Sequence, residues 1–183
     1  MTNALNKSRR SFLKASAAAG GGLALQVSFP ASALAQTAAA KGAEVTAWVV
    51  VRPDDSVIIR YARSEMGQGS FTAVPMLVAE ELECDWSKVT TEYPTPGQSV
   101  ARKRVWGDFQ TAGSRGIRSS EDYVRKGAAA ARIMLMQAAA NQWKVPLSEL
   151  TTSKNTITHK ASNRSIRYGK VALAASKLEA PKE

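Results

Sequence analysis

Two glycine-rich loops carry the residue types best suited to binding an anionic ligand. The first, Gly67-Gln68-Gly69, lies between an expected strand and an expected helix. Backbone N–H groups at such a position, with the positive end of the helix dipole, can hold a phosphate or the edge of a pterin ring. The amide side chain can pair with donors and acceptors. The triplet is also typical of an ordinary strand-to-helix turn, so this loop by itself leaves both interpretations open.

The second loop repeats this arrangement before another expected helix. Its sequence from 112 to 120 combines small residues, hydroxyls and two arginines. Two such loops could clamp one long anionic ligand from both sides. The candidate binding residues of the two loops are Gly67, Gln68, Gly69, Gly113, Ser114, Gly116, Ser119 and Ser120.

Other reactive side chains are weaker candidates for chemistry. The single cysteine, Cys84, has apolar neighbours and is expected to be a small buried hydrophobe, not a nucleophile. The single histidine, His159, is expected to be an exposed strand residue and not a metal ligand. Trp106 lies beside basic residues and is the one tryptophan that could line a pocket. The sequence therefore predicts neither a catalytic residue nor a metal ligand.

The elements before the second loop are predicted to begin with a β-hairpin. Apolar segments 48–52 and 57–62 flank a Pro-Asp-Asp-Ser turn, a pattern typical of two paired strands. Apolar residues at helical spacing then predict a helix after Gly69, capped by Ser70 or Thr72, with Pro75 in its first turn. A further strand is predicted at 89–93.

The elements after this strand are predicted to include the longest helix. The apolar residues of 94–119 follow neither helical nor strand periodicity, and this segment is expected to form a long loop. An Ala-rich helix is predicted at 120–143, with Ser119 or Ser120 as its cap. After a short turn at 145–150, a small hairpin at 156–168 and a last helix at 170–178 are expected. The fold class is α+β, with hairpins, short strands and two main helices.

The first 35 residues are predicted to be an export signal. A basic run containing the adjacent Arg9 and Arg10 precedes a small-residue apolar stretch and Ala33-Leu34-Ala35. Three consecutive glycines and Pro30 make the stretch too weak for a stable membrane span. The segment resembles a twin-arginine (Tat) signal. The Tat route exports folded proteins to the periplasm. We expect a linker at 36–44 and the domain at 45–183.

Charge and cysteine content exclude two classes of protein. The 183 residues contain 25 Lys and Arg and 15 Asp and Glu, a formal net charge of +10. Four of the basic residues lie in the leader, without an acid, and much of the remaining excess lies in loops. Since no aromatic residues are interleaved with this charge, a nucleic-acid binder is discounted. One cysteine cannot form an internal disulfide.

The two loops together resemble the molybdenum cofactor-binding subunit of the xanthine oxidase family. The similarity extends over residues 45–178 and, with the leader, points to the branch of isoquinoline 1-oxidoreductase large (beta) subunits and exported aldehyde dehydrogenases. In this branch a Met-Gly-Gln-Gly stretch lies near the start of the chain. The segments that carry the resemblance are Ser64-Glu65-Met66-Gly67-Gln68-Gly69-Ser70, Pro75-Met76-Leu77-Val78-Ala79-Glu80-Glu81-Leu82, Gly113-Ser114, Arg118-Ser119-Ser120 and Gly127-Ala128-Ala129-Ala130-Ala131-Arg132.

The resemblance implies a cofactor, a reaction and partners. The cofactor would be molybdopterin cytosine dinucleotide, with Gln68 and its two glycines against the pterin and the loop from Gly113 to Ser120 on its pterin and phosphate portion. Arg115 departs from the small polar residue expected there. The reaction would be hydroxylation of an N-heteroaromatic compound or oxidation of an aldehyde, with water as the oxygen source. Electrons would leave through a small [2Fe-2S] subunit, sometimes with a cytochrome c. Peripheral association of the protein with a membrane is left as an open question.

The resemblance also implies that part of the active site is missing from this chain. Family members use a glutamate base in a Gly-Glu-Pro-like stretch far along a longer chain, and no such stretch occurs here. Glu80, Glu81 and Glu83 are expected to form a solvated helix face, which leaves Glu65 as a fallback base. We therefore expect an N-terminal piece of a longer subunit, inactive alone, with apolar faces around residues 135–139 lacking a partner. The alternative is a non-catalytic exported cofactor-binding or assembly module.

Replacing Arg9 and Arg10 together by lysine should leave the protein in the cytoplasm, because the arginine pair is what the Tat machinery reads. Cell fractionation followed by immunoblotting measures this. An unchanged periplasmic yield would contradict the Tat assignment.

Overall fold

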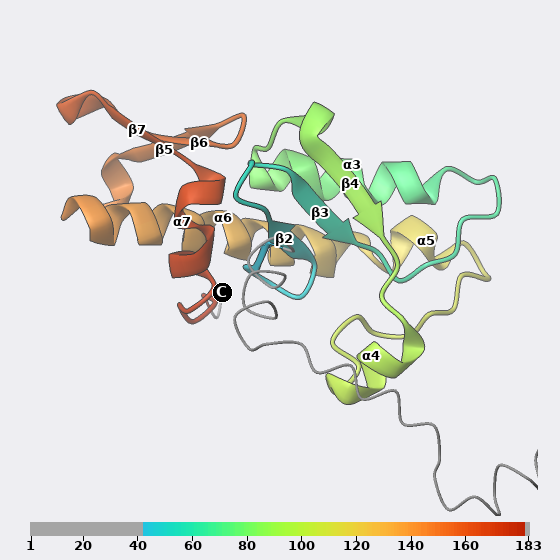
Figure 1. Ribbon diagram of the computed structural model, residues 1–183. Helices are drawn as coiled ribbons and strands as arrows, with labels where there is room; N and C mark the ends of the chain where they lie inside the picture. The colour runs from blue at the N-terminus through green and yellow to red at the C-terminus, as the bar shows by residue number, and fades with distance from the viewer. Residues whose placement is uncertain (1–41, 182–183) are drawn as a thin grey trace, which may run out of the picture. The chain divides into compact units, whose positions relative to one another are not determined.

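The computed structural model describes residues 42–181, and its first sheet contains the predicted hairpin (Figure 1). Strands β2 (Val49–Val51) and β3 (Val57–Arg60) pair antiparallel, with Val50 opposite Ile58. β1 (Ala43–Glu44) extends the sheet beside β2, two residues before the predicted start of the domain. β4 (Val89–Glu92) pairs parallel with β3, as the fourth strand in the order β1-β2-β3-β4. The predicted leader at 1–35 lies outside the described residues.

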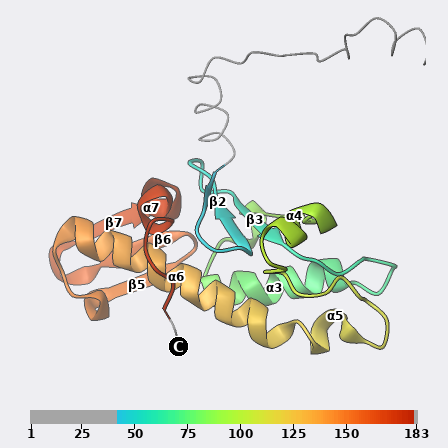
Figure 2. The same cartoon turned by 90° about the horizontal axis from the view of Figure 1, so that it is seen from below.

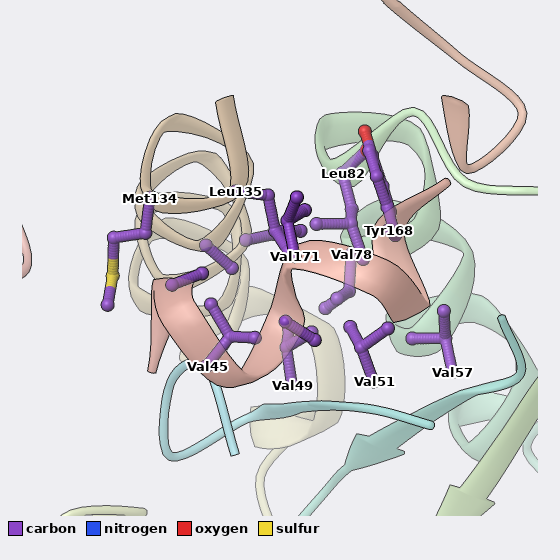
Figure 3. Packing of buried hydrophobic residues seen from close by; sticks show 14 of the residues in the cluster. Val45, Val49, Val51, Val57, Val78, Leu82, Met134, Leu135, Tyr168 and Val171 are labelled. Atoms are coloured by element: carbon purple, nitrogen blue, oxygen red, sulfur yellow. The ribbon is translucent and has the colours of Figure 1, made fainter. Parts of the chain in front are cut away.

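Two helices pack against each other and against the buried side of this sheet. α3 (Ser70–Leu82) and α6 (Glu121–Trp143) run side by side (Figure 2). In Figure 3 the sheet valines point toward Val78 and Leu82 of α3, Leu135 of α6 and Val171 of α7 (Tyr168–Ala175). Both Leu135 and Ala139 are fully buried within the chain, so the expectation that their face lacks a partner is wrong.

Alanine and glycine on α6 allow this close approach. A Cβ built on Gly127 would lie 2.7 Å from Cε3 of Trp48, a distance that real Cβ atoms essentially never show. Only glycine therefore lets α6 contact the ring of Trp48, which also lies 6.0 Å, between ring centroids, from Tyr123. Ala128, Ala131 and Ala139 are all completely buried, as expected for an Ala-rich helix in tight packing.

A second, three-stranded sheet follows α6. β5 (Leu150–Ser153), β6 (Thr156–His159) and β7 (Arg164–Arg167) are antiparallel neighbours in chain order. A 3₁₀ turn (Leu147–Glu149) precedes β5 and another (Lys160–Ser162) joins β6 to β7. The hairpin β6-β7 was predicted, whereas β5 was not. α7 (Tyr168–Ala175) begins and ends slightly earlier than predicted.

His159 is buried, contrary to the prediction of an exposed strand residue. Its Nε2 lies 2.7 Å from Glu149 Oε2, and its Nδ1 lies 2.6 Å from Ser162 Oγ. The ring thus bridges the two 3₁₀ turns that flank β5 and β7. A polar side chain can be buried in this way because both of its nitrogens have partners.

Residues 94–119 contain two short helices that periodicity did not indicate. α4 (Pro96–Ala101) starts with a capping box formed by Thr95 and Gln98. α5 (Arg115–Arg118) has a single turn. Trp106, which follows α4, is not part of the wall of the cavity between the two loops: its ring is buried and its Nε1 donates to the carbonyl of Ala47 over 2.8 Å. It anchors this segment to the turn between β1 and β2.

The acidic residues near the end of α3 are paired. Glu81 accepts a 2.5 Å hydrogen bond from Arg125 of α6, and Glu83 is bonded to Arg132 and, over 2.5 Å, to Thr152. The expectation of a solvated face holds for Glu80, whose side chain is 71% exposed, and is wrong for Glu81 and Glu83, because α6 places Arg125 and Arg132 opposite their carboxylates. Cys84 is mostly buried, which raises the pKa of its thiol to about 12 and makes it unsuited to nucleophilic chemistry.

No helix among residues 42–181 is both long enough and apolar enough to cross a lipid bilayer.

Candidate functional site

The first loop, residues 64–69, is held by the carboxylate of Glu65. Oε1 accepts hydrogen bonds from the backbone N–H of Gly67 (2.8 Å) and Gly69 (2.9 Å), and Oε2 accepts one from Phe71 (2.8 Å). These bonds, of which the one from Phe71 is the largest cause, lower the pKa of Glu65 below its ordinary value. The three N–H groups lie at the start of α3, so the carboxylate also complements the helix dipole.

This arrangement corrects the predicted start of α3. The N-cap is Gly69 in the left-handed conformation, without a side-chain cap, so neither Ser70 nor Thr72 has the predicted role. Glu65, five residues before the helix, accepts instead from the N–H of the N-cap Gly69 and from that of Phe71, the second residue of the helix. Pro75 is the sixth residue of the helix and lies beyond the first turn.

The side chain of Gln68 folds back onto its own loop. Its Oε1 accepts from the N–H of Met66 (2.6 Å), and its Nε2 donates to the carbonyl of Ser64 (2.8 Å) and to Ser70 Oγ (2.7 Å). The residue is exposed, and among residues 42–181 one lone pair of Oε1 has no partner.

The second loop is fixed by the residues that directly follow β3. Arg63 is buried, with 3% of its side chain exposed, and its guanidinium bonds Asp108, the carbonyl of Gln110 (2.5 Å) and Ser120 Oγ (3.3 Å). The hydroxyl of Tyr61 donates to the carbonyl of Gly116 over 3.1 Å. Sequence reasoning missed both residues, because their partners lie 45 to 57 positions away along the chain.

One cavity of about 720 Å³ lies between the two loops. Four of the eight predicted binding residues line it: Gln68, Gly113, Ser114 and Gly116. The sequence reasoning did not select the other residues of the wall, although most lie in the two loops. These are Met66, Ser70, Thr111, Ala112, Ile117, Arg118 and Glu121.

The other four predicted residues lie outside this wall. Gly67 and Gly69 direct their N–H groups to Glu65. Ser119 is exposed, and Ser120 is completely buried, with its hydroxyl bonded to Arg63 and, over 2.8 Å, to the hydroxyl of Tyr123. Ser120 therefore has a structural role in this structure.

The two loops touch at Gly116. A Cβ built there would lie 3.3 Å from Cβ of Ser70 and 3.4 Å from the hydroxyl oxygen of Tyr61. By contrast, a Cβ on Gly113 would meet nothing within 4 Å, because this residue borders open space. Within residues 42–181 the backbone N–H groups of Gly113 and Ser114 have no hydrogen-bond partner.

Comparison with known protein families assigns residues 3–182 to the molybdopterin cofactor-binding domain. The chain belongs to this family. It is 39% identical over 125 residues to the isoquinoline 1-oxidoreductase beta subunit of Brevundimonas diminuta, which covers 68% of this chain and 16% of that protein. It is 30% identical over 170 residues to the membrane-bound aldehyde dehydrogenase [pyrroloquinoline-quinone] of Gluconacetobacter polyoxogenes, covering 90% of this chain and 21% of that protein.

A similar fold is found in a solved enzyme structure. Quinoline 2-oxidoreductase of Pseudomonas putida 86 superposes with a TM-score of 0.54 and 18% identity, over 69% of this chain and 15% of that one. The α+β class and its place in a molybdopterin-binding domain are thereby confirmed. The chain spans between about a sixth and a fifth of the length of these relatives.

The residues around the cavity fit the phosphate of a molybdopterin cofactor in their binding chemistry. The second loop offers two unpaired N–H groups, a hydroxyl on Ser114 and the exposed guanidinium of Arg118, all donors to phosphate oxygens. Among residues 42–181 no group of three His, Cys, Asp or Glu could hold a metal ion directly.

The site contains no carboxylate arranged as a base. Glu65, the fallback candidate, has both oxygens bonded to backbone N–H groups and a lowered pKa, so it binds a proton poorly near neutral pH. Glu121 lines the cavity, but its Oε1 lies 3.9 Å from Nε of Arg125. What the arrangement can do is bind and orient a ligand.

Gly116→Val should lower the free energy of unfolding by about 1 to 3 kcal/mol more than Gly97→Val does, since the new side chain collides with α3. Gly97 is the matched control: it is exposed, helical and 4.0 Å from its nearest neighbour, Thr95 Oγ1. Urea unfolding followed by tryptophan fluorescence measures both variants. Equal losses would show that the two loops do not touch at Gly116.

Proposed function

We propose that this chain forms one wall of the site that binds molybdopterin cytosine dinucleotide in a molybdenum hydroxylase. The observation that carries the proposal is the convergence of both predicted loops on one cavity, in a chain of the molybdopterin cofactor-binding family. The whole enzyme would hydroxylate an N-heteroaromatic compound or oxidise an aldehyde, the two classes that the names of the relatives indicate. Water would supply the oxygen.

The second loop is proposed to hold the anionic part of the cofactor. A Cβ built on Gly113 would meet nothing within 4 Å, and among residues 42–181 the N–H groups of Gly113 and Ser114 have no hydrogen-bond partner. Among the same residues the guanidinium of Arg118 makes one hydrogen bond, of 3.2 Å, to the carbonyl of Gly113. Gln68 lies across the cavity. When bound, the cofactor supplies a redox-active molybdenum centre, and these residues bind and orient it.

The chain is proposed to act within a larger assembly. Glu121 is the carboxylate of the cavity wall, and it faces the guanidinium of Arg125 at 3.9 Å, so we expect no turnover by this chain alone. Electrons would pass to a small [2Fe-2S] subunit, in some assemblies followed by a cytochrome c. Export by the Tat route to the periplasm, with peripheral attachment to the membrane, agrees with the membrane-bound state of one relative.

Two alternatives differ from this function, one in the cofactor that is bound and the other in the contribution to turnover. One relative carries pyrroloquinoline quinone in its name, so a quinone is a competing cofactor. A non-catalytic cofactor-binding or assembly module would hold the dinucleotide without contributing to turnover. Cofactor analysis of the purified chain distinguishes a quinone from molybdopterin. A turnover assay of the full assembly distinguishes a non-catalytic module from part of an enzyme.

Arg118→Glu should reduce the molybdenum content of the purified chain about tenfold. The contact between the Arg118 guanidinium and a phosphate of the cofactor would be replaced by repulsion between a carboxylate and that phosphate. The chain is produced in cells that make the cofactor, and metal and nucleotide are measured by mass spectrometry and chromatography. Lys177→Glu, an equal change of charge on an exposed residue outside the cavity wall, is the control and should retain molybdenum. Equal molybdenum in both variants, or a quinone in place of molybdenum, would contradict the proposal.

A further inference from the structure

We propose that the second sheet and α7 form a basic surface that attaches to an anionic lipid bilayer, with Leu173 inserted between the headgroups. This surface gives the peripheral membrane attachment proposed above a place on the molecule, and it rests on that part of the proposed function alone. It uses no residue of the cavity wall and no property of the cofactor.

The charges of residues 42–181 are divided unevenly along the chain. Residues 42–143, which contain the first sheet, α3 and α6, include twelve basic and twelve acidic residues. Residues 144–181, which contain the second sheet and α7, include seven basic and two acidic residues. The whole positive excess of the described chain therefore begins at the C-cap of α6 and lies in the second sheet, α7 and their connections.

Most of this excess is exposed and not neutralised. Six of the seven basic residues are exposed and form no ion pair with another described residue, whereas the seventh, Arg167, is paired with Asp55. Of the two acidic residues, Glu149 is already bonded to His159. The six residues that form the basic surface are Lys144, Lys154, Lys160, Arg164, Lys170 and Lys177.

α7 adds an exposed apolar side chain between two of these lysines. One side of the helix packs against the core. On the other side Lys170, Leu173 and Lys177 follow one another at spacings of three and four residues, so they share one face. Leu173 is 67% exposed. An apolar side chain flanked by cations on an exposed helix face is typical of helices that lie in the interface of a bilayer.

The stability of α7 does not account for Lys170. This lysine is the third residue of the helix, and the first turn contains no acidic residue. A cation near the N-terminus of a helix is disfavoured by the helix dipole. Since Lys170 has no ion-pair partner among residues 42–181, we infer that its partner is an anion outside the chain.

The composition of the basic surface favours a bilayer over a protein partner. Five of its six cations are lysines, a residue type that is depleted from protein–protein interfaces, where aromatic residues, Met and Arg are enriched. Leu173 is the one large apolar side chain exposed among residues 144–181. A single leucine is too small to form the apolar centre of a protein interface. It can insert between headgroups, while the long lysine stems carry their charges to the level of the lipid phosphates.

The basic surface lies away from the cavity. α6 starts at Glu121, which lines the cavity, and ends next to Lys144. Its 23 residues span about 34 Å at the rise of an α-helix. Figures 1 and 2 show α7 and the second sheet away from α5, which borders the cavity. Attachment through the basic surface therefore leaves the cavity open.

The test is cosedimentation of the full chain with lipid vesicles. Neutral vesicles contain phosphatidylcholine alone, and mixed vesicles contain equal parts of phosphatidylcholine and phosphatidylglycerol. The wild type should bind the mixed vesicles and not the neutral ones. Salt at about 1 M, which shortens the screening length to about 3 Å, should weaken this binding. All variants keep residues 1–41, so any contribution of that segment is common to them.

Lys170→Glu combined with Lys177→Glu should lower the affinity for mixed vesicles about tenfold or more, because two attractive charges become repulsive. The control combines Lys103→Glu with Arg104→Glu, an equal change of net charge on two exposed residues outside the basic surface. It should retain most of the binding. Equal losses in the two double variants would show that only net charge matters and would overturn the proposal.

Leu173→Ala should weaken binding to mixed vesicles about tenfold, because less apolar surface leaves water on insertion. Alanine preserves the helix, and circular dichroism checks this. Val100→Ala is the control: Val100 is 65% exposed, lies on α4, and should bind as the wild type does. Unchanged binding by Leu173→Ala would contradict the insertion of α7.

Poly-glutamate serves as the probe for an acidic protein partner. Wild type that binds poly-glutamate but not mixed vesicles would overturn the proposal, as would equal binding to neutral and mixed vesicles.

Molybdenum content separates this proposal from the proposed cofactor function. The double lysine variant should contain as much molybdenum as the wild type, because neither lysine lines the cavity. If the wild type contains molybdenum but does not bind mixed vesicles, the membrane surface is refuted and the cofactor function stands. If it binds mixed vesicles as described but contains no molybdenum, the reverse conclusion follows.

Discussion

The buried guanidinium of Arg63 is the interaction on which the site depends most. A charge removed from water needs partners, and those of Arg63 among residues 42–181 are Asp108, the carbonyl of Gln110 and Ser120 Oγ, in the segment 108–120 that contains the second loop. Because Arg63 directly precedes the first loop, satisfying its charge brings the two loops together. Tyr61 and Ser64, on either side of Arg63, form further hydrogen bonds to this segment, at Gly116 and Thr111.

The two walls of the cavity are built by different means. The first loop has most of its polar groups satisfied internally, by Glu65 and by the Gln68 amide, and is therefore set before any ligand arrives. The second loop leaves the N–H groups of Gly113 and Ser114 unpaired in the described part of the chain. The second wall is therefore the one that offers these free donors to an anionic group of the ligand.

Local sequence predicted the elements whose apolar residues have strong periodicity. It did not predict the features that depend on contacts between residues far apart in the chain. The hairpin β2-β3 and helices α3 and α6 follow from apolar spacing, and both loops were found from glycines beside helix starts. The role of Glu65 contradicted the usual rule for an N-cap, since a side chain five residues before the helix replaced it. The burial of His159 depends on hydrogen bonds from its two ring nitrogens to Glu149 and Ser162, which periodicity does not reveal. The loop partners of Arg63 were hidden for the same reason.

Hydrogen exchange measured by mass spectrometry, with and without molybdopterin cytosine dinucleotide, tests the shared cavity most directly. Peptides covering residues 64–70 and 111–118 should both become protected on binding, while those covering β5 to β7 should not change, because the cavity is lined from both loops and from neither sheet. Protection confined to one loop, or located in the second sheet, would contradict a single site formed by both.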